Sequence, residues 1–184
     1  MSFESLIAFI LLLILSPLMI IVTLLIKLET RGPSIFWSKR YGLNKKIFLM
    51  PKFRSMILNT PIASSQTLKK PNQYITFFGK IIRKTSFDEL PQLWSIITGE
   101  MSFIGPRPLL STEKKLLSER EKFRGNQIKP GITGWAQVNG RDQNSPQMKI
   151  KHEKYYIENN SIYLKCKIIL KTFILLLQFK NIRH

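Results

Sequence analysis

The sequence contains little cysteine, little histidine and few acidic residues. Cys166 is the only cysteine among the 184 residues, and two histidines accompany it. This scarcity excludes an intramolecular disulfide framework, leaves too few ligands for a structural zinc site, and is typical of proteins in a reducing compartment. Eleven acidic residues face 29 lysines and arginines, which gives a formal net charge of +18. A charge of this size indicates an anionic partner, namely nucleic acid, anionic lipid or a phosphorylated substrate.

Positive charge is absent from the start of the chain. The first 26 residues contain no lysine or arginine and a single acid, Glu4. Within them, Leu6–Ile26 is apolar except at three positions, among them the pair Ser16-Pro17. A helix of this length extends about 31 Å, which matches the hydrocarbon thickness of a bilayer. The sequence therefore predicts a membrane helix over residues 1–27.

Two topologies remain open for this helix. A cleaved signal peptide is disfavoured because the segment has no basic n-region and no small-residue cleavage site. A transmembrane helix tolerates Pro17 as a kink if the freed backbone groups find partners. A re-entrant helix, which turns back at mid-membrane, needs a break at its centre, and Ser16-Pro17 lies there. Residues 27–84 carry 13 lysines and arginines and one acid, so the positive-inside rule places residues 28–184 in the cytoplasm.

Residues 28–184 are expected to form one cytosolic domain. Two short strands, 34–41 and 46–53, flank a turn and predict a β-hairpin. Helices are expected over 73–84, from Ser86 onward, 112–124, 147–159 and 161–179, and loops over 59–72, 102–111 and 125–145. The last helix is apolar with lysines on one side, which suits an amphipathic helix at a membrane interface. The predicted fold class is mainly α with a small β-hairpin, a re-entrant membrane helix and a compact α/β catalytic domain.

The pair Asp88-Glu89 is the first candidate for chemistry. Ser86 and Glu89 fit a capping box, and acids in a first helical turn are common for that reason alone. Two basic residues, Arg83 and Lys84, lie just upstream, and a helix N-terminus favours bound phosphate. An ionised carboxylate beside a cationic phosphate site acts either as a Mg²⁺ ligand or as a nucleophile toward phosphorus.

Basic residues elsewhere supply further candidates. Arg107 lies between two prolines that fix φ on both sides, and arginine matches phosphate bidentately; an ordinary surface turn is the alternative. The glycine-rich stretch 129–141 permits close backbone approach to an anion and ends in Arg141. Lys52 and Arg54 complete this basic set, with a solvated strand face as their alternative.

Three blocks of the sequence closely resemble the bacterial sugar transferases, also called monotopic phosphoglycosyl transferases. The blocks are RGPSIFWSKRYGLNKKIFLMPKFRSM (31–56), RKTSFDELPQLWSIITGEMSFIGPRPLL (83–110) and KPGITGWAQVNGR (129–141). They are long and follow one another in the expected order, and the resemblance extends from Ser16-Pro17 to about Thr172. Two positions, Pro146 and Lys165, depart from the family pattern outside these blocks.

The resemblance implies a function. The family transfers a sugar 1-phosphate from a UDP-sugar to polyprenyl phosphate and releases UMP, as the first membrane step of O-antigen, capsule, exopolysaccharide or glycoprotein glycan assembly. On this basis Asp88 is the nucleophile and a Mg²⁺ contact, and Glu89 assists as acid–base or metal-positioning partner. Arg83, Arg107 and Arg141 would bind the phosphates, and Ser16-Pro17 would break a re-entrant helix.

The implied location is the bacterial inner membrane, with the catalytic domain on its cytoplasmic face. Anionic lipid becomes the expected surface partner and downstream glycosyltransferases further ones, while nucleic acid becomes the least expected. A membrane-tethered nucleic-acid-binding protein and a non-catalytic scaffold are the alternatives. The first lacks a recognisable DNA- or RNA-binding motif, and the intact Asp88, Glu89, Arg107 and Arg141 argue against the second. The residues do not indicate which sugar is transferred.

Overall fold

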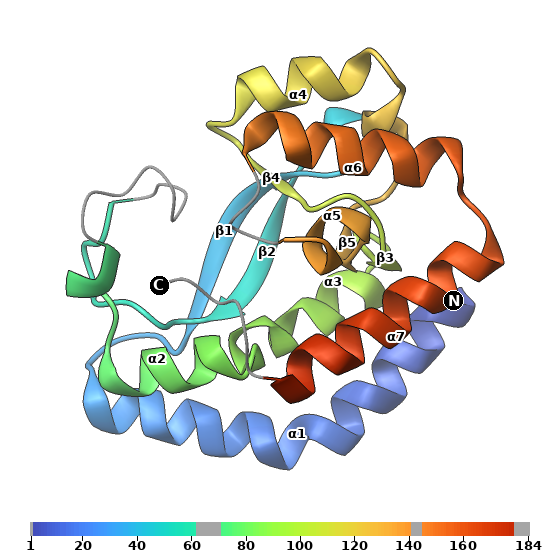
Figure 1. Ribbon diagram of the computed structural model, residues 1–184. Coiled ribbons are helices and arrows are strands. Elements are labelled where there is room, and N and C mark those ends of the chain that lie inside the picture. Colours follow the sequence, from blue (N-terminus) through green and yellow to red (C-terminus); the bar gives the residue numbers. More distant parts are fainter. Residues whose placement is uncertain (1, 62–70, 141–144, 179–184) are drawn as a thin grey trace. The chain divides into compact units, whose positions relative to one another are not determined.

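A computed structural model describes residues 2–61, 71–140 and 145–178 (Figure 1). The chain is mainly helical with a small amount of sheet, as the sequence predicts. The α-helices are α1 (Phe3–Glu29), α2 (Phe77–Lys84), α3 (Leu93–Ile97), α4 (Lys114–Glu121), α5 (Trp135–Val138), α6 (Pro146–Glu158) and α7 (Ile162–Gln178). The strands are β1 (Ile35–Tyr41), β2 (Ile47–Phe53), β3 (Ser102–Ile104), β4 (Leu109–Leu110) and β5 (Gly131–Thr133). Short 3₁₀ turns are η1 (Leu43–Lys45), η2 (Pro71–Gln73), η3 (Phe87–Gln92) and η4 (Gly125–Gln127).

These elements form two compact units. The first unit contains the described residues up to Ser38 together with Leu49–Gly99, and the second contains Lys39–Phe48 and the described residues from Glu100 onward. The chain passes from one unit to the other within the β1–β2 hairpin and again after Gly99. The apolar helix α1 belongs to the first unit, where it packs against α2 and α3. The predicted boundary between membrane helix and cytosolic domain at residue 27 stays a prediction.

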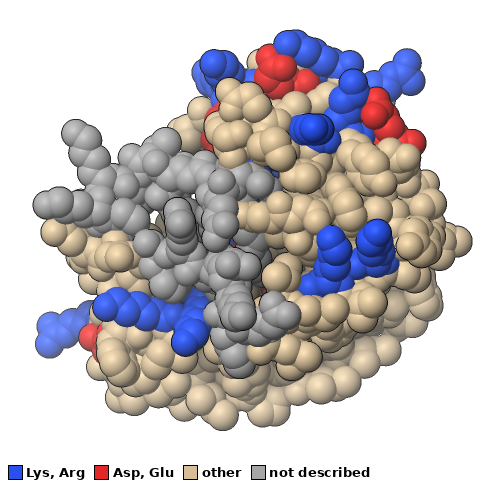
Figure 2. All heavy atoms as spheres, in the orientation of Figure 1, with Lys and Arg blue, Asp and Glu red and all other residues tan. Residues whose placement is uncertain are grey.

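Helix α1 is long and apolar enough to cross a membrane, and no other described helix meets that test. Ser2 caps its start by accepting a hydrogen bond from the Ser5 amide at 3.1 Å, as expected for an N-cap serine. Four of its residues, Ser5, Ala8, Val22 and Ile26, are buried, and most of its large apolar side chains are exposed. In Figure 2 the lower edge of the molecule, where Figure 1 draws α1, is made of uncharged residues.

The pair Ser16-Pro17 does not interrupt α1. The helix continues through Pro17, and Figure 1 shows it changing direction near its middle. Proline has no amide hydrogen for the Leu13 carbonyl four residues earlier. The Ser16 hydroxyl supplies it instead, since its Oγ donates to the Leu13 oxygen at 2.8 Å. The predicted break is therefore a bend inside one continuous helix, in which the neighbouring serine satisfies the carbonyl that proline leaves open.

The end of α1 is joined to the start of α2 by one carboxylate. Glu29 accepts hydrogen bonds from the Phe77 and Phe78 amides, the second at 3.1 Å. Thr76 caps the same turn by accepting from the Gly79 amide at 2.9 Å. Helix α2 therefore begins at Phe77 rather than at the predicted residue 73, because its caps lie there.

An apolar cluster forms the core of the first unit. Its buried members are Val22 and Ile26 from α1, Phe53 from β2 and Ile82 from α2. Leu18, Met19, Ile35, Phe87 and Leu90 pack against it. Each buried side chain of this size contributes roughly 1.5–3 kcal/mol by leaving water, so this cluster fixes the position of the η3 turn against α1.

The second unit contains sheet that the sequence does not reveal. The predicted hairpin is present, and the strand order β2-β1-β4 extends it by one antiparallel strand. Strands β3 and β5 form a second, parallel pair, in which Ser102 lies opposite Gly131 and Ile104 opposite Thr133. The predicted loops 102–111 and 125–145 thus contain three short strands and α5. Runs of two or three residues between prolines and glycines carry no periodic signal, which is why they read as loops.

Three glycines allow β3 and β5 to approach closely. A Cβ atom at Gly131 would lie 2.1 Å from the Gly105 nitrogen, and one at Gly134 would lie 2.1 Å from the Gly105 oxygen. Neither distance is compatible with a side chain. Gly131 and Gly134 of the 129–141 stretch therefore permit close packing on the protein's own backbone.

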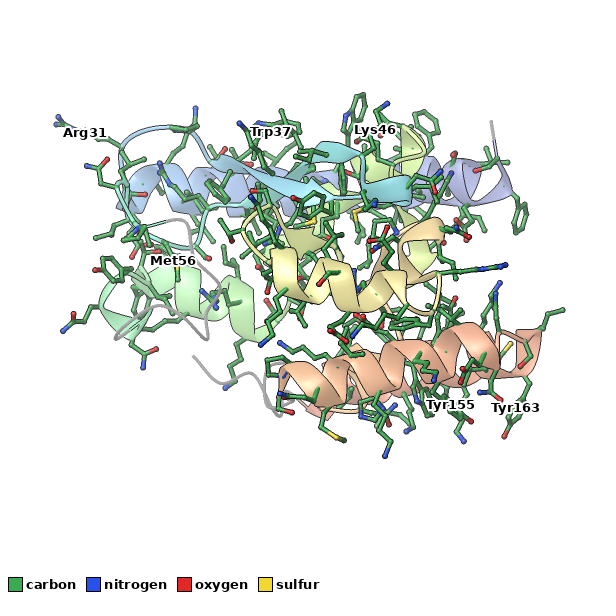
Figure 3. All side chains as sticks on the ribbon, turned by 90° about the horizontal axis from the view of Figure 1, so that it is seen from above. Arg31, Trp37, Lys46, Met56, Tyr155 and Tyr163 are labelled. Atoms are coloured by element: carbon green, nitrogen blue, oxygen red, sulfur yellow. The ribbon has the colours of Figure 1, made fainter. Side chains whose placement is uncertain are left out.

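Helix α7 has one buried side and one exposed apolar side. Leu164 and Ile168 are buried in a cluster with Val138 of α5 and Tyr156 of α6. The exposed large apolar residues of α7 are Ile162, Tyr163, Ile169, Leu170, Phe173, Ile174, Leu176 and Leu177. Figure 3 shows Tyr163 projecting from the start of the helix. The apolar helix predicted over 161–179 is confirmed over Ile162–Gln178.

The Glu29 carboxylate predicts a measurable contribution to stability. We expect Glu29→Ala to destabilise the protein by about 1 kcal/mol, because two amides of α2 lose their acceptor. In thermal unfolding in detergent this corresponds to a midpoint lowered by about 2–4 °C. Glu29→Gln retains an acceptor oxygen and should lose less. Glu158→Ala, which removes an exposed acid, is the control, and equal midpoints for Glu29→Ala and Glu158→Ala would contradict this account.

Candidate active site

The turn that carries the two acids is anchored by the residues on either side of them. Asp88 and Glu89 lie in η3, between Phe87 and Leu90. In a 3₁₀ turn residues three apart lie above one another, so Phe87 and Leu90 occupy the same side, and both pack against the apolar cluster. The two carboxylates are therefore directed away from the core side, and both residues are half-buried.

The predicted capping box at this turn is wrong. Ser86 has φ +59° and lies in the left-handed region, and its side chain makes no capping bond. An N-cap residue needs extended backbone to direct its oxygen at the following amides, so this conformation prevents the cap. The Glu89 amide donates to the Ser86 carbonyl at 3.1 Å instead. The turn is 3₁₀ and the following α3 has five residues, so it lacks the helix N-terminus expected to hold phosphate.

Lys52 is brought to the acidic pair. Its Nζ donates to Glu89 Oε1 at 2.7 Å, and the two side chains are 17% and 22% exposed. Because this pair is largely shielded from solvent, salt screens it less than a surface pair. The contact joins β2 to η3 and places one cation of the predicted basic set beside the carboxylates.

Arg83 and Arg54 lie in the same unit but in different surroundings. Arg83 is half-buried in the last turn of α2, five residues before Asp88. Arg54 is 7% exposed, and its Nη2 donates to the Thr30 carbonyl at 3.1 Å and to the Thr30 hydroxyl at 2.7 Å. A cation at a helix C-terminus is favourable, so Arg54 stabilises the end of α1. Substrate binding by Arg54 and Arg83 stays a prediction.

Arg107 belongs to the second unit. It is half-buried between Pro106 and Pro108, which are both buried. The Pro106 carbonyl accepts from the Gly131 amide at 2.9 Å, so β5 holds the segment from one side. The predicted rigidity of this proline-rich segment therefore has a second source besides the rings, namely hydrogen bonds to its carbonyls.

The predicted site also includes Arg141 and a metal ion. Arg141 lies outside the described residues. No group of three histidine, cysteine, aspartate or glutamate side chains able to hold a metal ion occurs within 2–61, 71–140 and 145–178. Mg²⁺ commonly binds through one or two carboxylates and completes its shell with substrate phosphates and water. The adjacent Asp88 and Glu89 fit that pattern, so these residues suit a metal that arrives with a phosphorylated substrate.

Comparison with known proteins identifies the family. Residues 1–179 match the bacterial sugar transferase family. The chain belongs to this family. The match covers both units, including α1 and the blocks around Asp88, Arg107 and Arg141, and it confirms the resemblance inferred from the sequence.

Several characterised relatives are considerably longer than this chain. It is 40% identical over 162 residues to the UDP-N-acetylgalactosamine-undecaprenyl-phosphate N-acetylgalactosaminephosphotransferase of Aeromonas hydrophila, which is 85% of this chain and 38% of that protein. It is 38% identical over 184 residues to the undecaprenyl-phosphate glucose phosphotransferase of Komagataeibacter xylinus, covering 93% of this chain and 34% of that protein. The uncharacterized sugar transferase EpsL of Bacillus subtilis is nearer in length: 40% identity extends over 80% of this chain and 71% of EpsL.

Sequence reasoning missed the residues that hold Arg107. Arg120 donates to the Arg107 carbonyl at 2.7 Å, and Arg40 donates to the Pro108 carbonyl at 3.1 Å. Arg120 stands in a charged segment that reads as an exposed helix, and its acidic partner in the fold is Glu153. The two residues carry opposite charges, but they are 33 positions apart in the sequence. No spacing pattern therefore indicates that they form a pair.

The shielded pair of Lys52 and Glu89 should have a larger coupling energy than an exposed ion pair. We expect a double-mutant cycle with Lys52→Met and Glu89→Gln to give a coupling of about 1 kcal/mol, because the pair is shielded from solvent. The matched control is Lys45 with Glu121, which are 2.6 Å apart but 46% and 58% exposed, and for which we expect less than about 0.5 kcal/mol. Unfolding of the variants in detergent measures both cycles. Equal coupling energies for the two pairs would show that the contact of Lys52 with Glu89 is no stronger than an exposed ion pair.

Proposed function

We propose that this chain transfers a sugar 1-phosphate from a UDP-sugar to polyprenyl phosphate, releases UMP, and so begins the assembly of a bacterial surface glycan. The observation that carries the proposal is the η3 turn, where Phe87 and Leu90 anchor two half-buried carboxylates and Lys52 holds one of them. Family membership supports it, and so do the printed names of relatives that act on undecaprenyl phosphate. Those names differ in the sugar, so the sugar is left to experiment.

The reaction is proposed to take two displacements at one phosphorus. A carboxylate oxygen of Asp88 attacks the sugar-proximal phosphorus of the UDP-sugar. The bond from that phosphorus to the bridging oxygen breaks, and UMP leaves with the electron pair. A phosphate oxygen of polyprenyl phosphate then attacks the aspartyl phosphosugar, and the Asp88 carboxylate leaves. Dividing the transfer in this way lets a soluble donor and a lipid acceptor use one small site in turn.

The other residues have supporting roles in this proposal. Glu89, held by Lys52, accepts or returns the proton of the acceptor phosphate or positions a metal ion. Arg83, Arg107 and Arg141 bind the phosphates, because a guanidinium pairs with phosphate oxygens bidentately. Asp88 and Glu89 would hold Mg²⁺, which when bound neutralises diphosphate charge and lets a carboxylate approach.

Membrane placement forms part of the same proposal. Helix α1 enters the bilayer, bends at Ser16-Pro17 and returns, so that both its ends face the cytoplasm. The exposed apolar side of α7 lies in the membrane interface, with the exposed Lys165 and Lys167 toward anionic lipid. Lys171 is directed to α5 instead, where its Nζ donates to Asn139 Oδ1 at 2.8 Å. Catalysis then takes place at the cytoplasmic face of the inner membrane. The strongly basic sequence after α1 supports this placement.

Replacement of the nucleophile is the direct test of activity. We expect Asp88→Asn to lower UMP release from UDP-sugars by about 10³-fold or more, because the amide cannot attack phosphorus. Incubation of the purified wild-type protein with UDP-sugar and Mg²⁺, without polyprenyl phosphate, should add one sugar phosphate to its intact mass. Hydroxylamine should remove that adduct, as expected of an acyl phosphate.

The controls separate loss of the nucleophile from loss of the fold. Glu121→Gln changes an exposed acid and should retain both the adduct and UMP release. Asp88→Asn should unfold at the wild-type temperature and give no adduct. Full turnover by a folded Asp88→Asn protein would show that another residue is the nucleophile.

The re-entrant topology predicts where the N-terminus lies. In a background in which Cys166 is replaced by serine, a cysteine at Ser2 should react with a membrane-impermeant maleimide only from the cytoplasmic side. A cysteine at the exposed Ser118 serves as the cytoplasmic reference. In Pro17→Leu the restored amide can bond to the Leu13 carbonyl, and the straightened helix should expose the Ser2 cysteine on the outer side. Labelling of the wild-type N-terminus from outside would establish a spanning helix instead.

A further inference from the structure

Arg120 and Glu153 form the most buried ion pair among the described residues. Arg120 Nε donates to Glu153 Oε2 at 2.7 Å, and Nη2 donates to Oε1, so the pair is bidentate. The two side chains are 6% and 5% exposed. Burying two charges is costly, and an apolar pair of the same volume is often as stable. Stability alone is therefore a weak reason for this pair.

The pair also reaches the segment that carries Arg107. Three consecutive carbonyls of Pro106-Arg107-Pro108 accept hydrogen bonds from three different places. Gly131 of β5 donates to the first at 2.9 Å, Arg120 Nη2 to the second at 2.7 Å and Arg40 Nη1 to the third at 3.1 Å. Prolines have no amide hydrogen, so these carbonyls are the main backbone groups through which the fold can hold the segment.

We infer that Arg120, oriented by Glu153, is a positioning residue that sets the direction of the Arg107 side chain. The ring of Pro108 fixes the φ that follows Arg107, and the bond from Arg120 fixes the orientation of the Arg107 carbonyl. Together they determine the peptide plane after Arg107 and hence where its Cα–Cβ bond points. The Glu153 carboxylate neutralises the Arg120 charge, so Arg120 acts on Arg107 without itself attracting the diphosphate.

This inference rests on the proposed function, in which Arg107 binds the diphosphate of the UDP-sugar. If Arg107 is held in its binding orientation before substrate arrives, less conformational freedom is lost on binding. Release of its carbonyl should therefore weaken UDP-sugar binding more than it slows the chemical steps at Asp88.

The test is a double-mutant cycle read out in KM. The double replacement Arg120→Met with Glu153→Leu removes both charges, keeps the volume filled and leaves the Arg107 carbonyl without its donor. With polyprenyl phosphate saturating, we expect the KM for UDP-sugar to rise about tenfold while kcat falls less than about threefold. In an Arg107→Ala background the same double replacement should change KM by less than twofold, because Arg107 is no longer there to be positioned.

A purely structural role predicts a different pattern. It would raise KM equally in both backgrounds, or lower the unfolding temperature without changing KM, and either result would overturn the inference. Lys122→Met, an exposed change beside the end of the same helix, should leave KM unchanged. If the double replacement fails to fold, Arg120→Lys serves instead. The lysine ammonium keeps a positive charge for Glu153, but it lacks the second donor group with which the guanidinium reaches the Arg107 carbonyl. The KM for UDP-sugar should therefore rise several-fold, and a wild-type KM would refute the inference.

The outcome also distinguishes this inference from the proposed function. An inactive wild-type protein, with no UMP released from any UDP-sugar, would contradict the function. An active wild-type protein whose Arg107 and Arg120 replacements act additively on KM would leave the function intact and contradict the positioning role.

Discussion

Burial of one apolar cluster connects the long apolar helix α1 to the turn that carries the carboxylates. Val22 and Ile26 belong to the last turns of α1, and Phe87 and Leu90 of η3 pack against the cluster they form with Phe53 and Ile82. Because the burial that fixes α1 also fixes η3, the depth that the proposed function gives α1 in the bilayer would also set the position of Asp88. In the proposed function, a donor from the cytoplasm and an acceptor from the lipid would then reach the same carboxylate.

The positive charge of the chain serves more than one purpose in this account. Few of its 29 basic residues are needed near a diphosphate. Arg54 stabilises the end of α1, Lys52 holds Glu89, and Arg120 is neutralised by Glu153. Most of the others are lysines at exposed positions, and lysines near an anionic membrane contribute about 1 kcal/mol each to its binding. In the proposed function, the charge of +18 is thus divided between internal support, phosphate binding and membrane association.

Much of the fold could be predicted from the sequence, where patterns were long. In the site, the structure brings Lys52 to Glu89, and the roles of the predicted site residues stay predictions. The apolar run of α1, the β1–β2 hairpin and the last two helices all extend over seven residues or more, and the structure contains them. The prediction of a capping box at Ser86 is wrong because the left-handed backbone of Ser86 changes the direction of its hydroxyl. The spacing of residue types in a sequence does not reveal backbone conformation. Strands β3, β4 and β5 were not predicted, because strands of two or three residues are too short to show a periodic hydrophobic pattern. The Arg120–Glu153 pair escaped because its partners are distant in sequence.

The central claim is that Asp88 forms a covalent intermediate, and the configuration at phosphorus tests it most directly. With a UDP-sugar carrying a sulfur-labelled, chiral sugar-proximal phosphate, each in-line displacement inverts the configuration. Two displacements predict net retention in the polyprenyl-linked product. Net inversion would mean that polyprenyl phosphate attacks the UDP-sugar in a single step, and it would contradict the nucleophilic role of Asp88.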